Sequence, residues 1–293
     1  MAISAKLVKE LRDRTGAGMM DAKKALEAVD GDIDKAIDFL RENGQIKAAK
    51  KADRIAAEGL AKVVIDGDKA VILEVNSETD FVAKNEKFQT MLDTIAHALL
   101  EQMPKDLDSA LKEVTVDGDS LEAYINAQIA VIGERLVLRR FAIFEKAADE
   151  SFGEYIHMGG SVATLVQVKT DKEDVARNIA LHVGGIAPQY VSEDAVPSDV
   201  RDHEREVLTQ ETLNEGKPEK IVDKIVDGRM HKFYSQIVLV DQDFLLDDSK
   251  TVGEYLKEQG AEAIDFRRYK VGEGLEKRNE DFAAEVQAEM NKN

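Results

Sequence analysis

The sequence predicts an α+β protein, in which helices come first along the chain and strands later pack against helices. Apolar residues recur at helical spacing over residues 1–44, whereas the alternation typical of strands begins near Leu60. The pattern of residues 70–76 returns at residues 162–168, which indicates two related halves. We therefore expect an N-terminal three-helix domain, two related α+β core subdomains, an inserted antiparallel helical hairpin and a C-terminal helix.

The first expected domain, residues 1–44, contains three short helices. The first helix follows Ser4, a suitable N-cap, and a TGAG run breaks it. A DGD run separates the second helix from the third, which we expect to end at the Asn43-Gly44 pair. A unit of this size resembles the ubiquitin-associated fold, a common docking module.

The next segment, residues 45–58, is expected to be a basic helical linker. Its cations stand among alanines; they are Lys47, Lys50, Lys51 and Arg54. A solvated helix explains them better than a nucleic-acid contact does, because the whole chain carries a net charge of −18. Residues 1–54 contain twelve Lys or Arg and ten Asp or Glu, so the remainder carries −20. This distribution favours a protein partner over a phosphate backbone.

Core subdomain N is expected over residues 59–148. An Asp66-Gly67 pair between two alternating apolar runs predicts a β-hairpin at its start. The other elements expected in this subdomain are helices over residues 86–101 and 121–133 and a strand over residues 139–144.

Core subdomain C is expected over residues 149–280, with a helical hairpin inserted at residues 198–234. We expect this charged hairpin to be a solvated projection whose seam contains Ile221, Ile225 and Met230. The other expected elements are a strand over residues 162–168, a helix around residues 179–182, a strand over residues 237–240, a helix over residues 252–259, a strand over residues 264–271 and a C-terminal helical module over residues 281–293.

Composition excludes several classes of protein and site. Cysteine is absent, which removes disulfides, thiol nucleophiles and Cys-based metal sites. No run of 18 apolar residues could span a membrane, and the first 14 residues lack the apolar core of a signal peptide. We therefore expect a cytoplasmic protein.

Groups typical of catalysis are scarce. The five histidines show no i, i+3 or i+4 pairing, and no P-loop or Gly-x-Ser-x-Gly motif occurs. We expect a binding or regulatory protein without a cofactor or metal, not an enzyme. His97 and His182 should be packed or hydrogen-bonded in the core, and the Met19-Met20 pair should pack in a core or loop.

The most informative segment is residues 73–84, where an acid and a large aromatic residue directly follow an expected strand. These residues fit a helix entry, with Thr79 or Asp80 as the cap and Phe81 packed as a hydrophobic staple. From the residues alone this helix entry is the favoured interpretation, and the alternative is a binding loop that presents Phe81 to a partner.

Two long motifs resemble the elongation factor Ts family. They are TDFVAK at residues 79–84 and LRDRTGAGMMDAKKAL at residues 11–26. Shorter resemblances follow along the whole chain, at residues 132–134, 139–140, 155–157, 228–230 and 249–252. The chain is therefore identified as a member of this family.

The resemblance implies a guanine-nucleotide exchange factor. Such a protein binds elongation factor Tu, with GDP or without nucleotide, and promotes GDP release during translation elongation by disturbing the magnesium and phosphate site. The family pattern implies no direct contact with nucleic acid or membrane. It leaves open whether the complex is one-to-one or a dimer of pairs.

The resemblance also implies which residues contact the partner. Thr79, Asp80, Phe81 and Val82 form an exchange wedge that enters between two helices beside the partner's magnesium site. The other implied contact residues are Lys23, Ile132, Gly133, His157, Leu245 and Leu246. Two other functions fit the residues alone: an adaptor that docks through residues 1–44 without exchange activity, and an RNA- or ribosome-associated factor that uses the cations of the linker.

Overall fold

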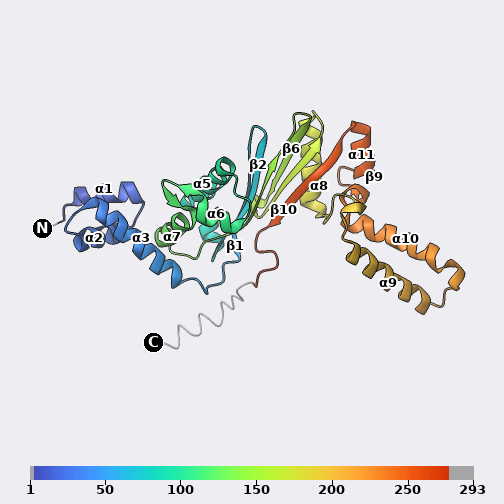
Figure 1. The fold of residues 1–293 in the computed structure, drawn as a ribbon, viewed down its shortest axis with the longest axis horizontal. Coiled ribbons are helices and arrows are strands. Elements are labelled where there is room, and N and C mark those ends of the chain that lie inside the picture. Colours follow the sequence, from blue (N-terminus) through green and yellow to red (C-terminus); the bar gives the residue numbers. More distant parts are fainter. Residues whose placement is uncertain (1–2, 277–293) are drawn as a thin grey trace. The chain divides into compact units, whose positions relative to one another are not determined.

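The computed structural model describes residues 3–276, which form helices and small antiparallel sheets (Figure 1). The prediction of an α+β protein is therefore confirmed. The predicted C-terminal helix at residues 281–293 lies outside the described residues.

The chain divides into two compact units. The first contains the described residues of Met1–Lys62, Leu73–Phe141 and Lys270–Asn293, and the second contains Val63–Ile72 and Ala142–Tyr269.

The first unit begins with three helices that share a small apolar core. These helices are α1 (Ala5–Thr15), α2 (Met19–Ala28) and α3 (Ile33–Ala49). Ser4 caps α1 as expected, because its hydroxyl accepts a hydrogen bond from the Leu7 N–H at 3.2 Å. Leu11 and Leu26 are fully buried where the three helices meet.

The expected end of the third helix at Asn43-Gly44 is wrong, because α3 continues through this pair to Ala49. The structure gives a different reason for the glycine. A Cβ atom at Gly44 would lie 3.4 Å from the Asn126 carbonyl oxygen and 3.6 Å from the Ala127 Cα, both on α7 (Leu121–Ile132). Gly44 therefore permits a close crossing of two helices and does not end one.

The first sheet has strand order β1-β2-β5, and helices separate β2 from β5 along the chain. Its hairpin turns at Gly67, which adopts a φ of 60° as the Asp-Gly signal predicts. The elements of this region are β1 (Glu58–Asp66), β2 (Lys69–Ser77), α4 (Asp80–Ala83), α5 (Glu86–Gln102), α6 (Leu107–Glu113), β3 (Thr115–Val116), β4 (Asp119–Ser120), α7 and β5 (Val137–Glu145).

The second unit is built on a sheet of order β10-β7-β6, in which β6 and β7 pair antiparallel from Glu150↔Lys169 to His157↔Val162. The elements of this unit are β6 (Glu150–His157), η1 (Met158–Gly160), β7 (Val162–Lys169), α8 (Glu173–Ile186), η2 (Glu193–Ala195), α9 (Ser198–Asn214), α10 (Glu219–Ile237), η3 (Leu239–Asp241), β8 (Asp243–Phe244), β9 (Asp247–Thr251), α11 (Val252–Gln259) and β10 (Glu262–Lys270).

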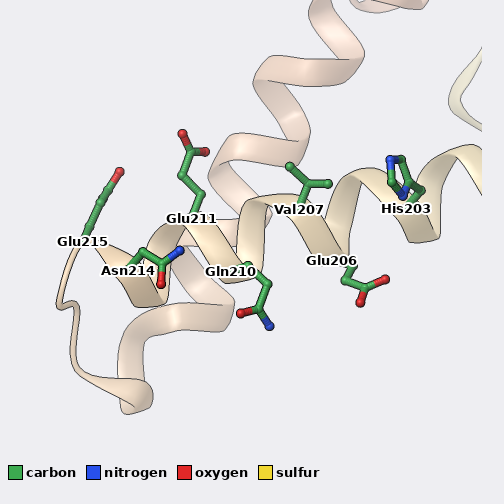
Figure 2. Close-up of a pocket in the computed structure, with 7 residues that line it drawn as sticks. All are labelled: His203, Glu206, Val207, Gln210, Glu211, Asn214 and Glu215. Carbon is green, nitrogen blue, oxygen red and sulfur yellow. The ribbon is translucent and has the colours of Figure 1, made fainter.

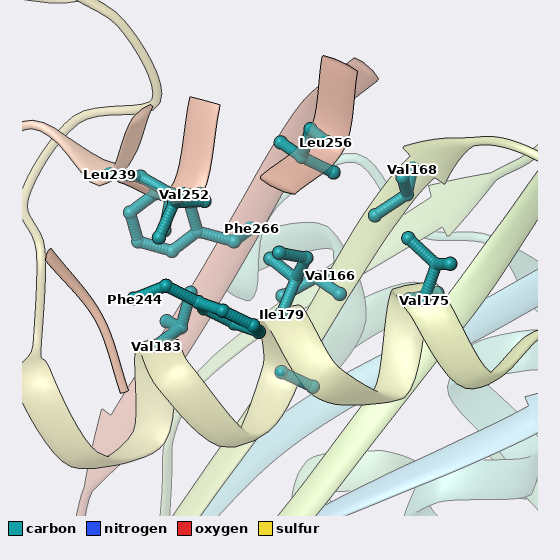
Figure 3. Close-up of a cluster of buried hydrophobic side chains, with 12 residues drawn as sticks. Val166, Val168, Val175, Ile179, Val183, Leu239, Phe244, Val252, Leu256 and Phe266 are labelled. Atoms are coloured by element: carbon teal, nitrogen blue, oxygen red, sulfur yellow. The ribbon is translucent and has the colours of Figure 1, made fainter. Parts of the chain in front are cut away.

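One apolar core lies between α8 and the elements around it (Figure 3). Val166 of β7, Ile179 of α8 and Leu239 of η3 are almost completely buried in it. The strand expected at residues 237–240 is wrong, because α10 runs to Ile237 and η3 follows. The residues are apolar because this connection is buried, as Val238 and Leu239 show, and not because they form a strand. Among the described residues, the run makes one isolated β-bridge, between Val238 and Tyr190.

Helices α9 and α10 run alongside each other as an antiparallel pair (Figure 1). The buried seam of α10 contains Val222, Val226 and Met230, so the expected seam at Ile221 and Ile225 is displaced by one residue. The order of buried residues still follows helical spacing, with steps of four.

Candidate partner-binding site

Phe81 lies on α4, the single helical turn between β2 and α5. Thr79 is the N-cap of this turn, and its hydroxyl accepts a hydrogen bond of 3.4 Å from the Val82 N–H. The helix entry proposed from the sequence therefore exists. Phe81 does not pack as a staple, however, because 79% of the residue is exposed, the highest value among the large apolar side chains of residues 3–276.

Asp80 and Phe81 share a contact with Lys84. The Lys84 Nζ donates to Asp80 Oδ2 at 2.6 Å and lies 5.9 Å from the centre of the Phe81 ring. The hydrogen bond from Lys84 holds the pKa of the Asp80 carboxyl below its ordinary value. Asp80 therefore carries a negative charge at neutral pH, directly beside the exposed ring.

Two glutamates join the turn that bears Phe81 to the segment after α7. Glu134 accepts two hydrogen bonds from Thr79, one of 2.9 Å from the backbone N–H and one of 2.7 Å from the hydroxyl. In the opposite direction, Glu78 accepts a bond of 2.6 Å from the Arg135 N–H. Each carboxylate therefore holds the backbone of the other segment. We call Glu78 and Glu134 the carboxylate clamp.

Cations from the segment after α3 complete this arrangement. Arg54 Nη1 donates to both oxygens of Glu78, at 3.3 and 3.2 Å, and the Arg135 guanidinium donates to the Arg54 carbonyl. Lys51 Nζ donates to the Gly133 carbonyl at 2.6 Å. Lys47, which lies within the last turns of α3, pairs with Asp21 at 3.0 Å. Three of the four linker cations therefore make contacts within the protein.

Ile132 and Gly133 end α7 next to the clamp. Ile132 is the last helical residue and is partly exposed. Gly133 is the C-cap with a φ of 92°, a backbone conformation that favours glycine, and its N–H donates to the Ile129 carbonyl at 2.9 Å. The clamp therefore brings the predicted wedge and the predicted core contact into one site.

The strand that leads into this site contains a fully buried acid, Glu74. Arg139 and Arg140 donate to its two oxygens at 3.0 and 2.6 Å, and the Gly272 N–H donates at 2.9 Å. Burial alone would raise the pKa of Glu74, but the Gly272 N–H and the two guanidinium groups together hold it below its ordinary value. The charged, fully bonded carboxylate fixes the position of β2 beneath the exposed turn.

Lys23 lies apart from this site along the chain, on α2. Its side chain is 50% exposed and forms a 3.6 Å ion pair with Glu27 on the same helix. Met19 and Met20 at the start of α2 are each 61% exposed, so the expectation that they pack in a core or loop is wrong. The first turn of α2 therefore offers flexible apolar side chains to solvent, close to a cation.

The second unit holds the remaining predicted residues at adjoining positions. His157 is exposed at the end of β6, and its Nδ1 shares a 2.9 Å hydrogen bond with the Tyr155 hydroxyl. Leu245 and Leu246 connect β8 to β9 and are 45% and 54% exposed.

The C-terminal end of α8 lies between these two features. A Cβ atom built on Gly184 would meet the Tyr155 ring at 2.6 Å, and one on Gly185 would meet Leu245 at 3.2 Å. Two further large apolar side chains in this part of the unit are exposed, namely Met158 and Ile186. We call these two residues together with Leu245 and Leu246 the apolar surface of the second unit.

The hollow on α9 has a different character (Figure 2). All of its lining residues lie on one side of this helix or directly after it, from His203 to Glu215. A surface provided by one helix has no opposing wall, so it does not enclose a ligand.

The histidines and acids of residues 3–276 form no group that could hold a metal ion. Within the same residues, no helix is both long and apolar enough to cross a membrane. His182 is buried and hydrogen-bonded as expected, whereas His97 is exposed and only its ring nitrogen contacts the Asp93 carbonyl of its own helix.

A comparison with known protein families identifies a match over much of the chain. The family model described as elongation factor TS matches residues 78–273. This range begins at Glu78 of the carboxylate clamp and includes both the turn of Phe81 and the apolar surface of the second unit. Lys23 and the three N-terminal helices precede it.

Proposed function

The chain belongs to the elongation factor Ts family of nucleotide exchange factors, and from this premise we propose that it binds elongation factor Tu–GDP and promotes GDP release. The exchange wedge consists of Thr79, Asp80, Phe81 and Val82. It acts by displacing groups that support the partner's magnesium and phosphate sites. No covalent bond of the nucleotide is made or broken, so the protein acts by binding and not as an enzyme.

The observation that carries this proposal is the exposure of Phe81 on a turn held from both sides. Water contacts most of the ring, although the Thr79 backbone is fixed by Glu134. Burying a Phe side chain contributes roughly 1.5–3 kcal/mol. Because the turn is already ordered, little of that free energy is spent on fixing the backbone when a partner covers the ring.

Phe81 alone cannot drive the release. A shift in nucleotide affinity from about nanomolar to about micromolar requires about 4 kcal/mol. Binding is coupled reciprocally, so the partner must lose nucleotide affinity by the same factor by which nucleotide weakens the complex. Further contacts must therefore supply the difference.

We assign these further contacts to three places. Ile132 and Gly133 lie beside the wedge, across the carboxylate clamp. Lys23, with the exposed methionines of α2, docks through helices α1–α3, which act as a ubiquitin-associated-like domain. The apolar surface of the second unit, with His157 at its edge, forms the third contact.

The test is direct. Elongation factor Tu loaded with a fluorescent GDP is mixed with this protein and excess unlabelled GDP, and nucleotide release is followed by stopped flow. We expect a saturable acceleration of release without hydrolysis. Binding without acceleration would favour the adaptor function, and no binding would refute the proposal.

A further inference from the structure

Leu245 and Leu246 are unusual residue types for the turn that they form. It joins β8 to β9 across the Phe244↔Asp247 pair, so it is a two-residue hairpin connection. Such connections favour Gly, Asn or Asp, because the preferred turn types require positive φ. Neither leucine has a positive φ, and both are exposed. The local sequence therefore does not by itself specify this turn.

A buried histidine reaches the turn from α8. His182 is fully buried, and its Nδ1 accepts a hydrogen bond of 3.1 Å from the Leu245 N–H. Its Nε2 lies 2.9 Å from Oε1 of Gln242, which is also buried. Gln242 Nε2 in turn donates to the Gln236 carbonyl at 2.9 Å. The chain of contacts runs from the end of α10 to the exposed leucines.

These contacts define the state of the imidazole. Because Nδ1 accepts from a backbone N–H, it carries no proton, and the proton of a neutral ring must be on Nε2. That proton points to Gln242 Oε1, which can only accept. Burial lowers the pKa of His182, against a smaller opposing effect of Gln242, and so favours the neutral ring. The chain of hydrogen bonds from Gln236 through Gln242 and His182 to Leu245 therefore has one arrangement of donors and acceptors.

Packing alone does not require a polar side chain here. Phe244, beside the ring at a centroid distance of 6.0 Å, stacks on Tyr255 at 4.2 Å within the apolar core. A leucine at position 182 would fill similar space without the cost of burying polar atoms. The directional bond to Leu245 is therefore what distinguishes histidine from an apolar residue at this position.

We propose that His182 is a positioning residue that holds the Leu245–Leu246 turn in place for a partner protein. Gln242 fixes the ring, and the ring fixes the backbone at the first leucine. This inference rests on the proposed function in one respect: the partner that covers the two leucines is elongation factor Tu.

Two near-isosteric variants separate the two nitrogens of the ring. His182→Asn places an oxygen near the position of Nδ1 and keeps an acceptor for the Leu245 N–H. His182→Gln places its amide near Nε2 and keeps the contact with Gln242 but loses that acceptor. Both variants bury one amide in the same cavity, so a general loss of packing affects them alike.

The first measurement is amide hydrogen exchange at Leu245 in the full-length protein. We expect exchange to accelerate roughly threefold to tenfold in His182→Gln, since a lost hydrogen bond costs about 0.5–1.5 kcal/mol, and to stay within about twofold of wild type in His182→Asn. Equal exchange in the two variants would overturn the positioning role. Because no partner is present, this result is independent of the proposed function.

The second measurement is the affinity of the same proteins for elongation factor Tu–GDP. We expect His182→Gln to bind roughly threefold to tenfold more weakly than His182→Asn. If Leu245 exchanges faster in His182→Gln but affinity is unchanged, the turn does not serve this partner and the inference fails. If wild type itself does not bind, the proposed function fails instead, and the exchange data still decide whether His182 positions the turn.

Discussion

Removal of Glu134 should weaken binding to elongation factor Tu without reducing the maximal rate of GDP release. Glu134→Ala deletes both hydrogen bonds that Thr79 donates to this carboxylate, at 2.9 and 2.7 Å. A typical hydrogen bond contributes about 0.5–1.5 kcal/mol net, and Glu134 is partly exposed, so we take about 0.7 kcal/mol for each of the two bonds. Re-forming the turn on binding therefore costs about 1.4 kcal/mol.

This cost falls equally on the complex with GDP and the complex without it, because it concerns only the order of the turn. It therefore weakens association by about tenfold and leaves the coupling to the nucleotide unchanged. In the fluorescent-GDP assay, the concentration of protein that gives half the maximal release rate should rise about tenfold. The maximal rate should change by less than about twofold.

Two variants control for side effects. In Glu134→Gln, the amide can accept from the Thr79 N–H and donate to its hydroxyl, so most of the affinity should return. Glu101→Ala removes an exposed carboxylate at the end of α5 and should behave as wild type. An unchanged half-saturating concentration in Glu134→Ala, or a fall in its maximal rate comparable with that of a Phe81 variant, would refute the role of the clamp.

Three further predictions concern stability and docking. Glu74→Gln should lower the free energy of unfolding by about 3 kcal/mol in denaturant titrations, because it removes the buried anion that two partly exposed guanidinium groups contact at 3.0 and 2.6 Å, and a loss below about 1 kcal/mol would contradict this. Lys23→Ala should weaken association severalfold at low salt but not at high salt, and Lys24→Ala is the neighbouring control. Thermal unfolding should be unchanged, because the ion pair that Lys23 forms with Glu27 is exposed. Because the pKa of His182 is lowered in the folded protein, the unfolded chain binds a proton at this residue more readily. The stability that the neutral, buried ring provides is therefore complete above the ordinary pKa of 6.5 and is lost as pH falls below that value. The loss should reach at most about 1.4 kcal/mol per pH unit and be absent in His182→Asn; equal slopes in the two proteins would contradict the assignment.

Much of the fold could be predicted because its signals are local. The Asp66-Gly67 hairpin and the periodic helices α5 and α7 depend on residues within a few positions of one another. Gly44 shows the limit of such reasoning. A helix-ending residue and a helix-crossing residue look alike in sequence, and only α7, far along the chain, distinguishes them.

The site was only partly accessible from sequence for the same reason. The motif at residues 79–84 singles out Phe81, yet a staple and an exposed wedge have the same pattern. The clamp joins positions 55 residues apart, so no spacing rule reveals it. One signal was present: Glu134 directly follows the Ile132-Gly133 pair that the family resemblance selects. The exposed start of α2 was missed because methionines more often fill cores than face solvent.

The predicted contact residues of the second unit are also brought together by contacts that the sequence does not reveal. His157 and Leu245 are distant along the chain, but the C-terminal end of α8 adjoins Tyr155, the hydrogen-bond partner of His157, through Gly184 and adjoins Leu245 through Gly185. A search for apolar periodicity finds buried faces, whereas this surface consists of exposed residues at element ends. Such surfaces are better recognised from exposure than from pattern.

The most direct measurement is the maximal rate of GDP release from elongation factor Tu saturated with Phe81→Ala. Truncation removes the side chain that is 79% exposed in the free protein, so the fold should be intact and only the contact with the partner lost. We expect the maximal rate to fall by about tenfold or more, the equivalent of roughly 1.5–3 kcal/mol. A maximal rate equal to that of wild type at saturation would contradict the proposal that this ring opens the nucleotide site.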